Sequence, residues 1–277
     1  TSLSNKEKIF LQFYKPWGII LFSRNIRSIP QTKKLTLEIR KIFKDKNYPI
    51  LIDQEGGRVN RLNSFFNADS LTGEYFGRLF TKDKKKFFYY YKIFINKTSY
   101  LLKNLGINVN TVPVLDVRVK GKSNIIGDRS FSSDPKVISK IGDICIDMFH
   151  KDKIGTVIKH IPGHGLAKVD SHKATPIVKI KYSKLIKNDF STFKEKKSLL
   201  SMTAHIVYED IDLINTATHS KKIIGIIRKK IKFNNIIMTD DISMRSLKFS
   251  IKENTIKAFS AGCNLVLHCN GNYAEML

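Results

Sequence analysis

The 277 residues include 42% hydrophobic residues, enough for one sizeable core, so we expect a single domain over residues 1–277. The 49 Lys and Arg against 24 Asp and Glu give a formal net charge of +25, but the lysines are spread along the whole chain. Because no zinc finger, aromatic-interleaved RNA motif or basic DNA-reading helix accompanies this charge, we expect no nucleic-acid partner.

The number of cysteines and the lengths of the apolar runs indicate the cellular compartment of the protein. Cys145, Cys263 and Cys269 are odd in number and form no CxxC pair, which excludes a disulfide framework and favours a reducing environment. No apolar run approaches the roughly 18 residues that span a bilayer, and residues 1–4 lack the apolar core of a signal peptide. We expect a cytoplasmic protein with no membrane partner.

Short apolar runs recur in chain order, and each ends in Gly, Pro or a polar cluster, as buried parallel strands do. The predicted strands are residues 19–22, 50–52, 112–115, 157–158, 199–202, 236–238 and 265–267. Helical stretches lie between several of them. One runs from about residue 82 to 105 and stops at Gly106, and another opens at Asp134-Pro135, where Asp can cap and Pro can occupy the first turn.

This alternation predicts an α/β fold, either a doubly wound sheet or a (β/α)8 TIM barrel. The barrel is favoured because most predicted strands are followed directly by chemically active side chains, and the corresponding loops of a barrel open onto one face. Seven strands are predicted. We therefore expect the first strand to lie before Thr1 and the last helix to continue beyond the final residue.

The densest cluster of reactive side chains is residues 159–165 (KHIPGHG), followed by Asp170, Ser171 and His172. Three interpretations stay open. Histidines 160, 164 and 172 could ligate zinc, although no second short-spaced His pair follows another strand. One or two of them could simply bond the backbone of a polar loop. In the third interpretation Asp170 orients His172, which then acts as a general acid and base.

Two adjacent acids, Asp240 and Asp241, follow a predicted strand. Neighbouring residues on a strand end point to opposite sides, so only one can enter a pocket. We expect Asp240 in the pocket. Asp241 could support the residues of the pocket or cap the following turn, and capping is the commoner function of Asp at such a position.

Two further loops carry charged groups. Residues 53–61 contain two acids, two arginines and Gly56-Gly57, which permit a backbone path closed to other residues. They could bind a ligand or form an ion-paired loop. Arg129 could hydrogen-bond a ligand through its guanidinium or pair with Asp128.

Taken together in this order, these segments resemble the family 3 glycoside hydrolases, specifically the single-domain bacterial β-N-acetylglucosaminidases of cell-wall recycling. The resemblance is carried by residues 18–25, 53–61, 113–117, 126–131, 159–165 with 170–172, 202–205 and 240–244. It implies a TIM barrel that removes terminal, non-reducing β-linked N-acetylglucosamine with retention of configuration and without a cofactor or metal. The chain departs from the family pattern at Ile161, where an aromatic is common, and at Thr239, where Ser is usual.

The resemblance also implies roles for individual residues. Asp240 corresponds to the nucleophile that forms a glycosyl-enzyme, and His172 to the acid/base, supported by Asp170. The residues implied to bind the sugar are Asp53, Arg61, Arg129, Lys159 and His160.

The implied enzyme is a monomeric β-N-acetylhexosaminidase that acts on GlcNAc-1,6-anhydroMurNAc fragments of peptidoglycan, with or without peptide. Two alternatives stay open. One is a zinc-dependent barrel hydrolase that uses the His cluster, and the other is a non-catalytic barrel that binds sugar or nucleic acid.

Overall fold

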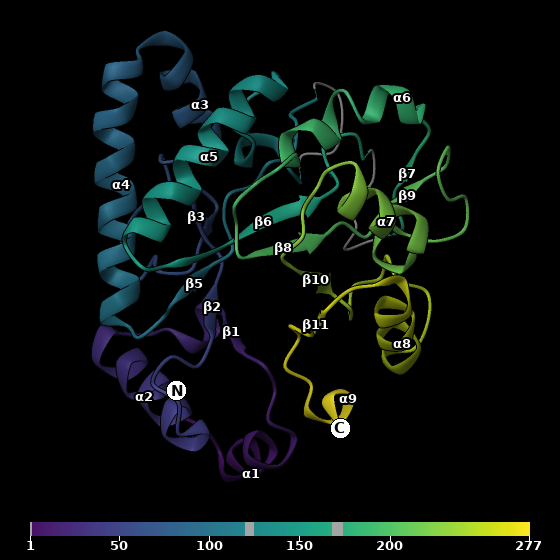
Figure 1. Cartoon of the computed structure of the whole chain (residues 1–277). Coiled ribbons are helices and arrows are strands. Elements are labelled where there is room, and N and C mark those ends of the chain that lie inside the picture. Colours follow the sequence, from purple (N-terminus) through teal and green to yellow (C-terminus); the bar gives the residue numbers. More distant parts are fainter. Residues whose placement is uncertain (1, 120–124, 168–173) are drawn as a thin grey trace.

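Seven parallel strands form the central sheet of the computed structural model, which describes residues 2–119, 125–167 and 174–277 (Figure 1). The sheet order is β1-β2-β5-β6-β8-β10-β11, so neighbours in the sheet also follow one another along the chain. The strands are β1 (Ile19–Leu21), β2 (Ile50–Ile52), β5 (Val109–Asn110), β6 (Gly155–Ile161), β8 (Leu200–Thr203), β10 (Ile236–Asp241) and β11 (Leu265–Leu267).

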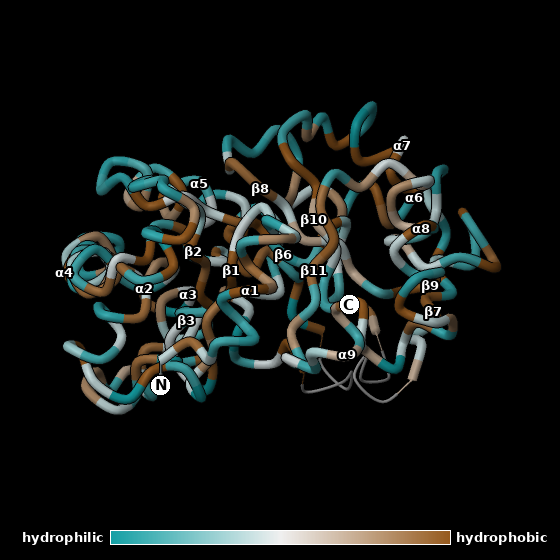
Figure 2. Tube along the Cα trace, turned by 90° about the horizontal axis from the view of Figure 1, so that it is seen from below, coloured by the Kyte–Doolittle hydropathy of each residue, from teal (hydrophilic) through white to brown (hydrophobic). Residues whose placement is uncertain are grey.

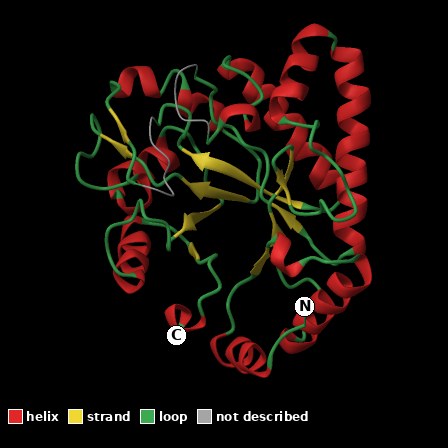
Figure 3. Cartoon of the chain, turned by 180° about the vertical axis from the view of Figure 1, so that it is seen from behind, coloured by secondary structure: helices red, strands yellow, loops and turns green. Residues whose placement is uncertain are grey.

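Helices surround this sheet on the outside, as Figure 3 shows with the strands in yellow and the helices in red. They are α1 (Asn5–Tyr14), α2 (Ile29–Phe43), α3 (Gly73–Lys82), α4 (Lys84–Asn104), α5 (Pro135–Lys151), α6 (Tyr182–Leu185), α7 (Lys221–Lys229), α8 (Ile251–Ala261) and α9 (Tyr273–Met276). Short 3-10 turns include η2 (Gly127–Arg129) and η3 (Asp189–Phe193). No helix in the described ranges has both the length and the apolar character that crossing a bilayer requires.

The sheet curls in the manner of a barrel. The loops that follow its two edge strands touch, because Arg24 Nη2 donates a hydrogen bond to the carbonyl oxygen of Cys269 at 2.5 Å. Parallel strands in chain order with helices outside are the architecture predicted from the sequence, so the α/β barrel class is confirmed. The strand expected before Thr1 stays a prediction.

Two apolar clusters pack on the two faces of the sheet. In β2, Leu51 belongs to an inner cluster made only of strand residues, whereas Ile50 and Ile52 belong to the larger cluster shared with the helices. Side chains alternate across a strand, so a strand with apolar residues at every position buries both faces. Figure 2 shows hydrophobic stretches, in brown, among the central strands and hydrophilic stretches, in teal, over much of the outer chain.

The strand predicted at residues 112–115 is wrong in its position. The regular strand is β5, at Val109–Asn110, and only an isolated bridge joins Val114 to Lys159. Pro113 has no N–H and cannot donate in a regular ladder. Residues 112–115 still lie alongside β6. Lys159 N donates a hydrogen bond to Pro113 O at 3.2 Å, and Leu115 N donates one to Lys159 O at 2.8 Å.

The predicted helix ends are confirmed. Asp134 caps α5 by accepting a hydrogen bond from Lys136 N at 2.8 Å, and Pro135 occupies the first turn. Helix α4 ends before Gly106, which has a left-handed φ of 73°. The helix runs on from α3 with only Asp83 between them, and Asp83 caps the start of α4.

Gly77 should be irreplaceable in α3, whereas Gly225 in α7 should not. A Cβ at Gly77 would lie 1.5 Å from the carbonyl oxygen of Phe131, while one at Gly225 would have no atom within 4 Å. We expect Gly77→Ala to lower the free energy of unfolding by about 1–3 kcal/mol through overpacking. Gly225→Ala should raise it by about 1 kcal/mol through helix propensity. Urea unfolding of both variants tests this, and a stabilised Gly77→Ala variant would contradict the close approach of α3 to Phe131.

Candidate active site

Charged side chains from several strand ends meet at the carboxyl edge of the sheet. Asp53 directly follows β2, Lys159 lies in β6 and Asp240 lies in β10. The strand ends thus bring these three residues to one edge of the sheet, as expected of a barrel.

Lys159 is the centre of the first group. Its Nζ lies 2.8 Å from Asp53 Oδ1, 2.7 Å from Glu55 Oε1 and 2.8 Å from Thr111 Oγ1. Thr111 also donates a short hydrogen bond to Asp53. Lys159 is only 2% exposed, so its charge is held by these neighbours and not by water.

Two arginines extend this group. Arg129 forms a two-point pair with Glu55, from Nε and Nη2, at 2.8 Å each. Arg61 Nη2 lies 3.3 Å from Asp53 Oδ2. The alternative pairing of Arg129 with Asp128 is wrong, because Asp128 lies 3.3 Å from Arg58 Nε.

Helix α3 places Arg129 by letting its backbone approach closely. A Cβ at Gly73 would lie 2.2 Å from the carbonyl oxygen of Arg129, so only glycine fits where the helix begins. No feature of the sequence near Gly73 predicted this contact with Arg129, which lies 56 residues away.

The charges in this group keep one another ionised. Burial alone raises the pKa of Asp53, but Lys159 and Arg61 outweigh it and hold the pKa well below its usual range. In the same way Arg129 and Lys159 outweigh burial and lower the pKa of Glu55 to about 2. The carboxylates in turn outweigh the burial of Lys159 and raise its pKa. All of these groups are therefore charged at neutral pH.

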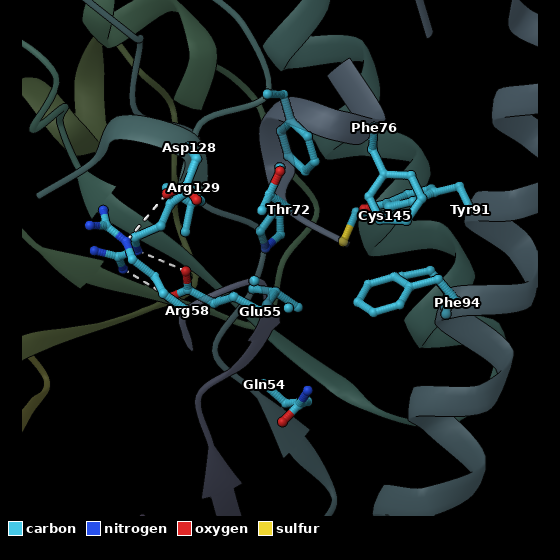
Figure 4. Close-up of a pocket in the computed structure, with 18 of the residues that line it drawn as sticks. Gln54, Glu55, Arg58, Thr72, Phe76, Tyr91, Phe94, Asp128, Arg129 and Cys145 are labelled. Carbon is cyan, nitrogen blue, oxygen red and sulfur yellow. Dashed lines mark hydrogen bonds and ion pairs between the residues drawn. The ribbon is translucent and has the colours of Figure 1, made fainter. Parts of the chain in front are cut away.

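A small cavity of about 30 Å³ lies behind Glu55 and Arg129 (Figure 4). In Figure 4 these two residues form one side, and Phe76, Tyr91 and Phe94 form the other. The apolar wall lowers the polarity beside the ion pair, which strengthens the attraction between Glu55 and Arg129. It also makes the loss of either partner costly.

The histidine segment is organised by Asp116, which is fully buried. Its carboxylate lies 2.7 Å from His160 Nδ1 and accepts a hydrogen bond from the backbone N–H of His164 at 2.6 Å. Burial, with the charge of His160, lowers the pKa of His164 to about 4, so this ring is neutral at pH 7. His160 therefore has a structural partner, but its ring bonds a carboxylate and not the loop backbone, as the second interpretation had expected. The contact described for His164 is made by its backbone N–H.

Strand β9 (Val207–Tyr208) supports the same segment from the other side. The Tyr208 hydroxyl donates a short hydrogen bond to the carbonyl oxygen of Gly163. A Cβ at Gly163 would lie 2.9 Å from Asp189 Cβ, and its φ of 146° also favours glycine. Strand β9 pairs with β7 (Ile177–Val178), so it contacts the chain on both sides of residues 168–173.

Asp240 is half-buried near the end of β10. Burial alone raises its pKa, but His160, His205 and Lys159 together outweigh burial and lower it. Its carboxylate is thus ionised near neutral pH and lies within electrostatic reach of the other groups of the site.

Asp241 has a different role. Its carboxylate accepts hydrogen bonds from Ser243 N at 3.0 Å, Ser243 Oγ at 2.7 Å and Cys269 N at 3.0 Å. These contacts cap the turn after β10, as expected for Asp241. The backbone carbonyl of Asp241 also lies 3.0 Å from His205 Nε2.

The predicted pair of Asp170 and His172 lies outside the described residues. Among residues 2–119, 125–167 and 174–277, no three or more His, Cys, Asp or Glu side chains are grouped so that they could hold a metal ion. This result applies to His160 and His164 but not to His172, the third histidine of the zinc interpretation.

No individual role was predicted for Glu55, Thr111, Asp116 or His205, and His164 was considered only as a possible zinc ligand or backbone-bonded histidine. Thr111 directly follows β5, so a strand predicted at Val109–Asn110 would have identified it as a strand-end residue. The pairing of Glu55 with Arg129 joins residues 74 positions apart, and no feature of the nearby sequence predicts it.

Comparisons with known proteins place this chain in a defined context. A family model described as the glycosyl hydrolase family 3 N terminal domain matches residues 3–277. A Beta-hexosaminidase of Nitrosomonas eutropha is 31% identical over 277 residues, which cover 98% of this chain and 78% of the relative. A Beta-hexosaminidase of Idiomarina loihiensis is 31% identical over 278 residues, with 98% and 81% covered.

Solved structures are similar as well. Native NagZ from Neisseria gonorrhoeae matches with a TM-score of 0.89 at 30% identity, over 99% of this chain and 80% of that chain. NagZ from the same organism in complex with N-trifluoroacetyl-D-glucosamine matches with a TM-score of 0.85 at 30% identity, over 97% and 78%.

The buried Glu55 carboxylate should stabilise the fold in a pH-dependent way. Replacing it by Gln leaves Arg129 and Lys159 without part of their countercharge, so we expect Glu55→Gln to lower the free energy of unfolding at pH 7 by about 3 kcal/mol. The folded-state pKa of Glu55 is lowered from 4.5 to about 2. Its contribution is therefore complete above about pH 5 and is lost as the pH falls toward 2.

Denaturant unfolding of the wild type and the variant between pH 7 and pH 2 measures this difference. We expect the two stabilities to converge as the pH falls. The matched control is Glu195→Gln, since Glu195 is exposed and forms its ion pair with the exposed Lys232. If Glu195→Gln lowered the free energy of unfolding as much as Glu55→Gln, the stabilisation would not come from the burial of Glu55.

Proposed function

This chain belongs to glycosyl hydrolase family 3, and we propose that it is a retaining β-N-acetylglucosaminidase that releases a terminal, non-reducing N-acetylglucosamine. Relatives about 30% identical over most of their length are named Beta-hexosaminidase, and one similar structure holds an N-acylated glucosamine analogue. The observation that most supports the proposal is the ionised carboxylate of Asp240 in the same electrostatic site as Lys159 and His160.

In the first step, the Asp240 carboxylate attacks the anomeric carbon as the bond from that carbon to the leaving oxygen breaks. The leaving oxygen takes a proton from His172. An oxocarbenium-like transition state is stabilised by an anion below the anomeric carbon, which is why a lowered pKa at Asp240 suits the role. The product is a glycosyl ester on Asp240 and a free aglycone hydroxyl.

In the second step, His172 removes a proton from water, and the oxygen attacks the anomeric carbon from the face that the aglycone left. The ester bond to Asp240 breaks, and the sugar leaves with its original β configuration. Imidazole suits both directions, since its unperturbed pKa of about 6.5 lets it give and take a proton near neutral pH. Asp170 would orient the ring and stabilise its protonated form.

The charged group around Lys159 would bind the sugar. The side chains of Arg61 and Asp53 are 27% and 14% exposed, whereas that of Lys159 is 3% exposed. Arg61 and Asp53 are therefore the groups best able to meet sugar hydroxyls. Arg129, 13% exposed, would contact the sugar beside its pair with Glu55, and Lys159 would act mainly by holding Asp53 and Glu55 in place. His160 would contact the sugar from the histidine segment.

As a substrate we propose GlcNAc-1,6-anhydroMurNAc from peptidoglycan, with or without its peptide. The anomeric linkage broken is the one between the two sugars. This choice of substrate rests on the similarity to proteins named NagZ and Beta-hexosaminidase. The proposed reaction would be the same with another terminal β-linked N-acetylglucosamine.

Activity on a chromogenic N-acetyl-β-glucosaminide tests the reaction. We expect hydrolysis by the wild type, unchanged by a chelator, and a loss of about a thousandfold or more in kcat for Asp240→Ala. NMR of the first product formed should show the β anomer. Activity lost on chelation and restored by zinc would favour a metal-dependent hydrolase, and sugar binding without turnover would favour a non-catalytic barrel.

Covalent trapping tests the nucleophile separately. A 5-fluoro analogue of N-acetylglucosaminyl fluoride slows breakdown of the glycosyl-enzyme, so a mass adduct should accumulate on the peptide that contains Asp240. Asp241→Asn is the matched control, and it should keep the adduct on Asp240 despite losing its turn contacts. An adduct on any other residue would overturn the assignment.

A further inference from the structure

Helix α4 lies along the outer edge of the molecule, with α3 and α5 packed against its inner side (Figure 1). Its inward positions are buried, among them Phe87, Tyr91 and Phe94. Figure 2 shows the same helix end-on at the margin of the molecule. The other side of α4 is exposed to solvent over the length of the helix.

The exposed side carries an apolar stripe. Tyr89, Ile93 and Tyr100 follow one another at spacings of four and seven residues, which places them on one side of a helix. They are 65%, 50% and 62% exposed. Phe88 and Tyr90 are also exposed, on the two flanks of this stripe. We call these five side chains the α4 stripe.

Lysines border the α4 stripe. They are Lys85, Lys86, Lys92, Lys97 and Lys103, and no Asp or Glu occurs between residues 84 and 104. Within the described parts of the chain, the one ion pair made by these lysines joins Lys86 to Asp83, at 3.8 Å. The net charge of the whole protein explains many exposed lysines, but it does not explain their combination with aromatic side chains on one acid-free face.

We propose that the α4 stripe and its bordering lysines dock on the surface of an anionic lipid bilayer. A helix with an apolar stripe, aromatic residues and lysines on both sides is the type that lies in a membrane interface. Tyrosine rings are favoured at the headgroup level, and lysine stems extend along apolar surface while the ammonium groups reach the anionic headgroups. These headgroups supply the negative charge that the face lacks.

The shape of the face also suits a bilayer. At a rise of 1.5 Å per residue, the straight helix from Lys85 to Lys103 presents a face about 27 Å long. Nucleic acid fits less well, because the face has no arginine for two-point phosphate contacts and is not a groove. The contact would be peripheral. It revises the expectation of no membrane partner, which rested on the lack of a spanning segment and on the even spread of lysine along the sequence.

Cosedimentation of the purified chain with vesicles tests the proposal. One set of vesicles contains phosphatidylcholine with about 30% phosphatidylglycerol, and the other contains phosphatidylcholine alone. We expect at least about tenfold more binding to the anionic vesicles. Two triple variants should each lower that binding by about tenfold, one with Tyr89→Ala, Ile93→Ala and Tyr100→Ala, and one with Lys85→Gln, Lys92→Gln and Lys103→Gln.

The matched control carries Lys221→Gln, Lys222→Gln and Lys229→Gln on α7, where the same number of exposed lysines is lost. We expect its vesicle binding to stay within about twofold of the wild type. Circular dichroism confirms that all variants stay folded. Equal losses in the α7 control and the α4 lysine variant would reduce the effect to net charge and overturn the proposal.

Two further outcomes would also overturn it. The first is a wild type that fails to sediment with anionic vesicles. The second is binding to a single-stranded oligonucleotide that depends on the α4 lysines while vesicle binding does not. None of the altered residues lies in the proposed catalytic site, so hydrolase activity in solution reports on folding and not on docking.

Discussion

Lys159 joins two parts of the sheet because its buried ammonium is shared by Asp53 and Glu55, which follow a different strand. None of the three groups could be buried alone without a large desolvation cost. Through Glu55 the same group reaches Arg129 in η2, so strand ends and a distant turn become one charged unit. The glycine at position 73 is needed for that unit, because it lets the backbone of Arg129 approach α3.

The same charges set the state of the proposed nucleophile. Burial alone would raise the pKa of Asp240, but His160, His205 and Lys159 outweigh it and lower that pKa. A site built in this way holds its carboxylates ionised without exposing them to water. The cost is that the residues that would bind substrate also support the fold, so a change made for one purpose affects the other.

Features that depend on neighbouring residues in the sequence could be predicted, whereas contacts between distant residues could not. The run at residues 50–52 is apolar at every position and is bounded by Pro49 and Asp53, so it could be identified locally as a buried strand. The strand at 109–110 was misplaced, because the more apolar segment after it contains Pro113 and bonds irregularly to β6.

Pairing between distant segments was harder to predict. Asp128 stands next to Arg129 in the sequence but binds Arg58, and Arg129 instead reaches Glu55, 74 residues away. Asp116, for which no individual role was predicted, organises His160 across 44 residues. Such choices depend on how the strands lie side by side, which spacing along the chain does not encode.

The curled sheet is held less firmly at one place than elsewhere. Strands β1 and β11 each pair with one neighbour only within the described chain, and an exposed contact from Arg24 to the carbonyl of Cys269 links the loops beyond them. Local opening costs least where few backbone bonds must break, so amide hydrogen exchange should be fastest along this seam and slowest at the central strand β6. Asp240 lies one strand from the seam and Lys159 lies at the centre. The nucleophile would therefore belong to the part of the molecule that opens more often, and the charged cluster to the part that opens least.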